Sequence, residues 1–350
     1  MPDPVQITPK NNYFLLGQEE AEKALLEAYN SNKLHNSWLI SGVKGIGKAT
    51  LAYRFARFLL DEKRRVFAPA ATLATSPDSR SNLLISSNSH PDFKVIERDF
   101  IETDRKKVLK AIKDGAAMDE DELRNLKKSA FIRIDDVRGI NEFFSRKSSD
   151  DGWRAVVIDS IDDMNSASAN ALLKILEEPP AKSILMLISH NVGQLLPTIR
   201  SRCTKLVLKP LADNTVASLL RRYRSDLDEN TIKGLARIAG GSIGKALNYA
   251  DCGALERYSR LSDIIYAGNR FKLQDMLDWT EEATASEESF DLAAELVLKF
   301  CSDHILESRN IEETARAWEE AVKILRQVNG LNMDKKQALI NIIANLCKIM

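Results

Sequence analysis

The chain has 350 residues, of which 44% are hydrophobic and 29% are charged, and its 50 basic residues balance 50 acidic ones. This length allows two or three domains of about 100–200 residues, and the balanced charge by itself predicts neither a nucleic-acid nor a membrane partner. No apolar run approaches the roughly 18 residues of a membrane span, and the first residues lack the basic and apolar regions of a signal peptide. We therefore expect a cytoplasmic protein without a membrane partner.

The cysteines lie far apart in the sequence and never form a C-x-x-C pair. They are Cys203, Cys252, Cys301 and Cys347. Ordinary buried thiols are a better interpretation than disulfides or a zinc site, so we expect neither zinc nor another bound metal.

The first predicted elements surround a glycine-rich loop. Residues 1–12 have the composition of a polar arm, and residues 18–29 combine acids in the first turn with one apolar face, which predicts an amphipathic helix. Residues 38–40 form an apolar run of strand length, and residues 51–60 repeat apolar positions at helical spacing. The order strand, glycine loop, helix is typical of a phosphate-binding loop.

The loop itself contains Gly42, Gly45, Gly47 and Lys48 in the Walker A pattern G-x-x-x-x-G-K-[ST]. Its glycines allow backbone N–H groups to face an anion, the next helix adds the positive end of its dipole, and the lysine would reach the outer phosphates. ATP is the cofactor that such a loop would hold. A glycine-rich turn that binds nothing is the alternative.

One position departs from this pattern, because Ala49 stands where a hydroxyl group should hold Mg²⁺. Thr50 follows, but adjacent helix residues point about 100° apart, so its hydroxyl cannot simply replace the missing ligand. Both residues belong to the predicted nucleotide-binding segment. We expect this segment to permit nucleotide binding and to impair hydrolysis.

The middle of the first half is less regular. Residues 61–88 are rich in Ser, Ala and Pro and predict a loop, whereas residues 93–96 predict a strand. Residues 99–130 are heavily charged, which favours a solvated helical face or an insertion over a binding tract. Residues 134–144 predict a helix with an aspartate suited to its cap.

A second strand, residues 153–159, ends in Asp159. An aspartate at the end of a strand beside a phosphate loop holds the Mg²⁺ shell in nucleotide-binding α/β domains, although a plain strand-end or capping aspartate is the alternative. The carboxylate expected next is replaced by Ser160, and Asp162 and Asp163, further along, should face elsewhere. With Ala49, two of the parts that hydrolysis needs are changed, which indicates a chain that has lost its own ATPase activity.

The remaining pattern predicts the fold class. Residues 165–178 form a strong helix stopped by two prolines, and residues 184–189 form a buried strand, after which residues 189–191 either sense a γ-phosphate or serve as ordinary loop residues. Alternating strands and helices predict an α/β domain with a parallel sheet and helices on both faces. The strand signal disappears after residue 210, and helices follow to residue 350.

Four motifs resemble the AAA+ clamp-loader subunits of bacterial DNA polymerase III, the delta-prime family in particular. They are residues 42–50, 169–180, 196–203 and 241–247, in the order and spacing of that family. The resemblance covers about residues 15–250 and implies an AAA+ P-loop domain (1–209), a small helical lid (210–265) and a helical C-terminal collar that oligomerises (266–350).

The resemblance also implies a function in DNA replication. The chain would be one subunit of a five-subunit ring that opens the sliding clamp and places it on primer-template DNA, within a DNA-directed DNA polymerase holoenzyme. Its partners would be the other loader subunits, the clamp and, through the assembled complex, DNA.

Arg202 is the catalytic residue that the resemblance implies, acting in trans. In this family the arginine of a Ser-Arg-Cys motif enters the ATP site of the neighbouring subunit, where such a group accelerates phosphoryl transfer about 10³–10⁵-fold in other NTPases. A surface or interface ion pair is the alternative for Arg202. Lys245 replaces the nucleotide-sensing arginine of the lid, and residues 51–202 lack the cysteines of the zinc module found in related subunits.

Two functions of other classes compete with this interpretation. An active AAA+ ATPase or remodelling motor would need the parts that Ala49 and Ser160 replace. A nucleotide-gated DNA-binding protein without ring partners would need a basic stripe or interleaved aromatic residues, and the sequence shows neither clearly.

Overall fold

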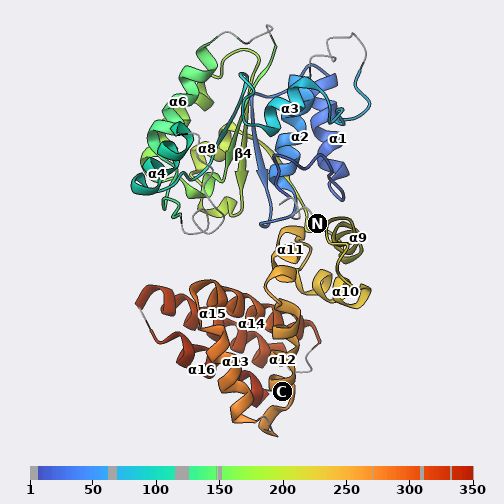
Figure 1. Cartoon of the computed structure of the whole chain (residues 1–350), viewed down its shortest axis with the longest axis vertical. Coiled ribbons are helices and arrows are strands. Elements are labelled where there is room, and N and C mark those ends of the chain that lie inside the picture. The colour runs from blue at the N-terminus through green and yellow to red at the C-terminus, as the bar shows by residue number, and fades with distance from the viewer. Residues whose placement is uncertain are drawn as a thin grey trace. The chain divides into compact units, whose positions relative to one another are not determined.

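The computed structural model describes residues 7–61, 69–114, 126–146, 148, 152–270, 272–307, 311–331 and 333–349. Parts of the predicted arm, loop and charged segment lie outside the described residues, namely 1–6, 62–68 and 115–125. The chain divides into two compact units, Met1–Thr215 and Val216–Met350 (Figure 1). The domain boundaries predicted after residues 209 and 265 stay predictions.

The first unit is built on a five-stranded sheet in the order β2-β3-β4-β1-β5, in which all pairs are parallel. The strands are β1 (Ser37–Ser41), β2 (Phe93–Ile96), β3 (Arg154–Asp159), β4 (Ser183–Ser189) and β5 (Thr204–Val207). Ser41 pairs with Ser189, and Asp159 pairs with Ile188, so the ends of β1, β3 and β4 meet at one edge of the sheet. The predicted parallel sheet is confirmed, and β5 is an addition to it.

Helices cover both faces of this sheet (Figure 1). They are α1 (Glu19–Asn30), α2 (Lys48–Leu60) and α3 (Arg80–Ser86) on one face, and α6 (Ile134–Ser145), α7 (Ser166–Glu177) and α8 (Pro197–Arg202) on the other. The unit also contains α4 (Glu102–Lys113). Alternate strand residues point to opposite faces, so Ile40 packs with α1, α2 and α3, whereas Leu39 packs with α6, α7 and α8. Burial on both faces explains why the central strands are continuous apolar runs.

One local prediction is wrong. Residues 61–88 were expected to form a loop, but α3 lies within them. The side chain of Ser79 caps this helix by accepting a hydrogen bond from the backbone N–H of Asn82, and Ile85 is fully buried in the core beside α2. A cap and one buried face stabilise a helix too short for its periodicity to be recognised.

All described elements of the second unit are helices. They are α9 (Asp213–Tyr223, which begins in the first unit), α10 (Glu229–Ile238), α11 (Ile243–Asp251), α12 (Ala254–Tyr266), η4 (Gly268–Arg270), α13 (Leu273–Ala283), α14 (Glu287–Glu307), α15 (Ile311–Leu331) and α16 (Lys335–Ile349). Gly240 and Gly241 both have positive φ and form the predicted break between α10 and α11. No described helix is long and apolar enough to cross a membrane.

The cysteines are reduced, and three of them are buried as predicted. Cys252 is exposed, which corrects the expectation that all four thiols are buried. It is the C-cap residue of α11, and its sulfur lies 3.8 Å from the side-chain oxygen of Asn248. A residue at the end of a helix can leave the apolar stripe without disturbing the core.

Candidate functional site

The glycine-rich loop lies between the end of β1 and the start of α2, as predicted. Gly42, Gly45 and Gly47 have φ angles of 145°, 82° and 100°, in the region that residues with a Cβ rarely adopt. Gly42 is also sterically required, because an added Cβ would lie 2.5 Å from the backbone oxygen of Leu208. The loop therefore packs directly against the chain that follows β5.

Lys48 begins α2, and its buried ammonium group donates hydrogen bonds to the carbonyl oxygens of Gly42 (2.6 Å) and Val43 (2.5 Å). Burial lowers the pKa of Lys48 to about 8, and the charges of Asp159 and Asp162 partly offset this effect. The ammonium group thus lies inside the loop, within electrostatic range of two carboxylates. A cation in this place is suited to an anion that enters the loop.

The next two residues do not supply a metal ligand in the usual way. Ala49 has no side-chain oxygen, and the side chain of Thr50 is buried in the first turn of α2. The described residues contain no group of three or more His, Cys, Asp or Glu side chains that could hold a metal ion. At the position where the Walker A pattern places a hydroxyl ligand for Mg²⁺, Ala49 supplies none.

Asp159 ends β3 at the same edge of the sheet as the loop. Burial raises its pKa, the charge of Glu97 raises it further, and Lys48 acts in the opposite direction. Ser160, which follows, is buried and caps the 3₁₀ helix η2 (Ile161–Asp163) by accepting a hydrogen bond from the backbone N–H of Asp162 (3.2 Å). Ser160, which stands where a catalytic carboxylate was expected, thus acts as the cap of η2.

Asp162 connects the ends of β3 and β4. Its carboxylate accepts hydrogen bonds from the hydroxyl groups of Ser160 (2.6 Å) and Ser189 (2.9 Å) and from the backbone N–H groups of His190 (2.6 Å) and Asn191 (3.1 Å). Burial would raise the pKa of Asp162, but these hydrogen bonds outweigh it and hold the pKa below its ordinary value. The carboxylate is the anion to which these four donors point.

The expectation that Asp162 faces elsewhere is therefore wrong. The chain turns back in η2 directly after β3, and this turn directs the side chain toward β4. Asp163 forms an ion pair with Arg98 (3.2 Å). Ser189, His190 and Asn191 were interpreted either as residues that sense a γ-phosphate or as ordinary loop residues. In the structure, the hydroxyl of Ser189 and the backbone N–H groups of His190 and Asn191 donate to the carboxylate of Asp162 in the same chain.

A buried glutamine that the sequence analysis did not single out joins the loop to the chain after β5. The side-chain nitrogen of Gln18 donates to the carbonyl oxygens of Ile46 (3.2 Å) and Lys209 (3.0 Å). Gln18 precedes α1 and makes no side-chain cap hydrogen bond there. Its sequence position resembles a solvated helix start, so only the tertiary contacts disclose its role.

Arg202 lies at the opposite edge of the sheet from the loop. It ends α8 and is followed by the buried Cys203 and by β5, whose residue Thr204 pairs with Trp38 near the start of β1. One terminal guanidinium nitrogen donates to the carbonyl oxygen of Thr198 (3.1 Å), and the other donates to Glu177 (2.9 Å). The side chain remains 35% exposed and forms an ion pair within its own chain.

Lys245 belongs to the second unit, where it lies in the first turn of α11. Its ammonium group forms an ion pair with Glu295 of α14 (3.2 Å), and its backbone N–H donates to the capping Ser242 (3.1 Å). Its predicted part in nucleotide sensing stays a prediction.

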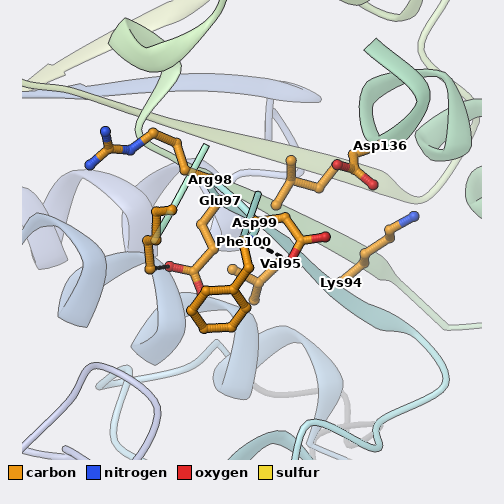
Figure 2. Close-up of a pocket in the computed structure, with 9 residues that line it drawn as sticks. Lys94, Val95, Glu97, Arg98, Asp99, Phe100 and Asp136 are labelled. Carbon is orange, nitrogen blue, oxygen red and sulfur yellow. Dashed lines mark hydrogen bonds and ion pairs between the residues drawn. The ribbon is translucent and has the colours of Figure 1, made fainter. Parts of the chain in front are cut away.

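A pocket of about 250 Å³ opens at the end of β2 (Figure 2). Its walls combine three cations, three acids and three apolar residues: Lys94, Val95, Ile96, Glu97, Arg98, Asp99, Phe100, Lys128 and Asp136. Lys128 forms an ion pair with Glu97 (3.2 Å), and these two charges shift the pKa of Asp159 in opposite directions. Because the charges of the pocket offset one another, we assign no ligand to it.

The fold and the loop place the protein in the class of α/β proteins whose parallel sheet carries a P-loop at the end of β1. The family model described as DNA polymerase III, delta subunit matches residues 17–212, which is 196 of 350 residues. The chain belongs to this family.

Similar proteins bear the names of subunits of the same polymerase. The delta' subunit from Pseudomonas aeruginosa is 32% identical over 209 residues, which make up 59% of this chain and 53% of that protein. The gamma subunit from Buchnera aphidicola is 26% identical over 244 residues, or 69% of this chain and 57% of that protein. The chain thus spans about half the length of the curated relatives it matches.

Among solved structures, the chain is similar to a DNA polymerase III gamma subunit-related protein from Thermotoga maritima. The alignment covers 93% of this chain and 99% of that one, at 17% identity and a TM-score of 0.43.

Proposed function

We propose that the chain is a clamp-loader subunit of DNA polymerase III that acts in DNA replication as part of a ring with other subunits and helps to load the sliding clamp onto primed DNA. In this ring it supplies Arg202 to the ATP site of a neighbouring subunit, and its own ATP hydrolysis is lost. Membership of the family supports the first statement. The positions of the two candidate sites within the first unit support the second.

The observation on which the proposal rests is that Arg202 and the P-loop occupy opposite edges of one sheet. Arg202 precedes β5, whereas the loop follows β1, and the two strands run parallel with Trp38 opposite Thr204. About five strand residues, or roughly 16 Å, therefore separate the two backbones. An arginine side chain is too short to span that distance and contact a phosphate in its own loop, which supports a role of Arg202 at the ATP site of another subunit.

The chain's own loop has the opposite character. It keeps Lys48 and the glycines that suit a phosphate, but Ala49 and Ser160 replace the hydroxyl and the carboxylate on which metal-assisted hydrolysis depends. Its strand-end donors are hydrogen-bonded to Asp162. Such a site suits a subunit that activates a neighbour and does not turn over ATP itself.

The test is ATP turnover by the reconstituted loader with clamp and primed DNA, comparing wild type with Arg202→Ala, alongside turnover by the isolated chain. We expect the isolated chain to be inert and the intact Arg202→Ala complex to lose at least about tenfold in kcat. Lys205→Ala is the matched control, since it removes an exposed cation three residues further on.

Size-exclusion chromatography must show that each variant complex assembles. Turnover by an assembled Arg202→Ala complex at the wild-type rate would overturn the trans-acting arginine. Vigorous turnover by the isolated chain would instead favour an active ATPase and would make Thr50 or a nearby acid the residue to explain.

A further inference from the structure

Glu177 stands at a place where a carboxylate is electrostatically unfavourable. It is the last residue of α7, which ends before two prolines, and it is followed by a second glutamate, Glu178. The end of a helix carries the negative pole of the macrodipole and favours cations. Exceptions to local rules gather at functional positions, so the partner of Glu177 bears on its role.

The partner of Glu177 is the guanidinium group of Arg202. Glu177 Oε1 accepts from one terminal nitrogen of that group (2.9 Å), and the carbonyl oxygen of Thr198 accepts from the other (3.1 Å). An arginine has five N–H donors in one plane, so these two contacts leave three donors for another acceptor. The same carbonyl of Thr198 also accepts from the hydroxyl of Ser201 (3.0 Å).

Both ends of this ion pair stand on a rigid base. Leu176, next to Glu177, and Ile199 and Cys203, on either side of Arg202, are buried in the same hydrophobic cluster, in which α7 packs against α8. Side chains that project from such packed helix ends start from a fixed backbone position. The ion pair itself stays accessible, with Arg202 35% and Glu177 52% exposed.

We propose that Glu177 is the positioning residue of the Arg202 finger, holding one edge of the guanidinium so that its remaining donors face the phosphate of the neighbouring subunit. The proposal rests on the function proposed above for Arg202. A free arginine side chain loses much rotamer freedom when it engages a phosphate, and holding it beforehand removes part of that cost at the moment of reaction. Glu177 touches no substrate and acts only through Arg202.

A surface ion pair of this kind has a modest energy, so the expected effect is modest as well. We expect Glu177→Ala to lower kcat of the assembled loader about fivefold with the KM for ATP unchanged. Glu177→Gln, which keeps an acceptor oxygen without the charge, should lower kcat about twofold. Glu178→Ala is the matched control: Glu178 is exposed and forms no ion pair with any described residue.

A double-mutant cycle separates positioning from a general structural role. Steady-state ATP turnover is measured for complexes that contain wild type, Arg202→Ala, Glu177→Ala or both substitutions. If Glu177 acts through Arg202, its replacement changes nothing once Arg202 is absent, so the double variant matches Arg202→Ala.

The outcomes distinguish the two proposals. A tenfold loss in Arg202→Ala, with Glu177→Ala at or above the wild-type rate, would overturn the role of Glu177 and leave the finger intact. So would a Glu177→Ala effect that multiplies with that of Arg202→Ala or appears in KM. An unchanged rate in Arg202→Ala would overturn the finger and the positioning role together.

Discussion

The two edges of the sheet in the first unit, where the strands begin and where they end, differ in how their polar groups are bound. At the edge where β1, β3 and β4 end, polar groups are engaged with one another: the buried Lys48 binds loop carbonyls, and the half-buried Asp162 accepts four hydrogen bonds. At the other edge, Arg202 is exposed and held by one carbonyl and one carboxylate.

This difference indicates what each edge contributes to the protein. Groups that satisfy one another inside the chain stabilise it, and removing one leaves buried donors or acceptors without a partner. A group offered to another subunit must stay accessible and contributes little to the stability of its own chain. Substitutions at the edge that contains the loop should therefore lower the free energy of unfolding more than substitutions at the edge that contains Arg202.

The largest effect is expected at Asp162. Replacing it with alanine leaves two hydroxyl and two backbone N–H donors without their acceptor, and we expect the free energy of unfolding to fall by about 2–3 kcal/mol at pH 7. Asp163→Ala, which removes only a partly exposed ion pair with Arg98, should cost less than about 1 kcal/mol. Urea denaturation of the full chain measures both.

The Asp162 contribution should also depend on pH. Its pKa in the folded state lies below the ordinary value of 3.8, so its stabilising effect is complete above about pH 4 and is lost as the pH falls through the folded-state pKa. The difference between wild type and Asp162→Ala should therefore shrink in acid. Equal stability of the Asp162 and Asp163 variants at pH 7 would contradict the special place of this carboxylate.

A smaller effect is expected at Lys48, where the stability of the wild type also rises with pH, but in the alkaline range. Its pKa is about 8 in the folded chain against an ordinary value of 10.5, so between these pH values the unfolded chain binds a proton that the folded chain does not. Stability of the wild type should rise across this interval relative to Lys48→Met, by about 1–2 kcal/mol after solvent screening.

Urea denaturation at several pH values from 7 to 10.5 checks this expectation. Lys205→Met controls for the loss of one cation, because Lys205 lies at an exposed position of β5. A stability difference between wild type and Lys48→Met that does not change across the interval would mean that Lys48 is not held as a buried cation.

The sequence disclosed the sheet and the loop because both leave local patterns. Strands buried on two faces become apolar runs, and a turn with positive φ angles needs glycine. Strand β5 left no such pattern: it is an edge strand in which only Leu206 is buried and Lys205 is exposed. Edge strands are commonly short and charged, which hides them from a search for apolar runs.

The contacts within the candidate sites could not be predicted, because they join residues distant in sequence. Asp162 and Ser189 are 27 positions apart, and Glu177 and Arg202 are 25 positions apart. Sequence analysis identified Arg202 through the resemblance of its motif, but neither spacing nor residue type pointed to Glu177 as its partner. Such pairs can be recognised only in the folded structure, where the sheet fixes the positions of the connecting helices and loops.

The smallest effect on stability is expected at the edge that we assign to a neighbouring subunit. Arg202→Ala and Glu177→Ala each remove an exposed ion pair, so the free energy of unfolding of the full chain should change by less than about 0.5 kcal/mol in either variant. Thermal and urea denaturation at pH 7 measure it, with Glu178→Ala as the control. A loss above about 2 kcal/mol in either variant would mean that the pair holds α7 and α8 together, and a fall in turnover could then reflect a damaged fold. If stability is preserved while turnover falls, the lost turnover reflects the contact of Arg202 with another chain and not damage to its own fold.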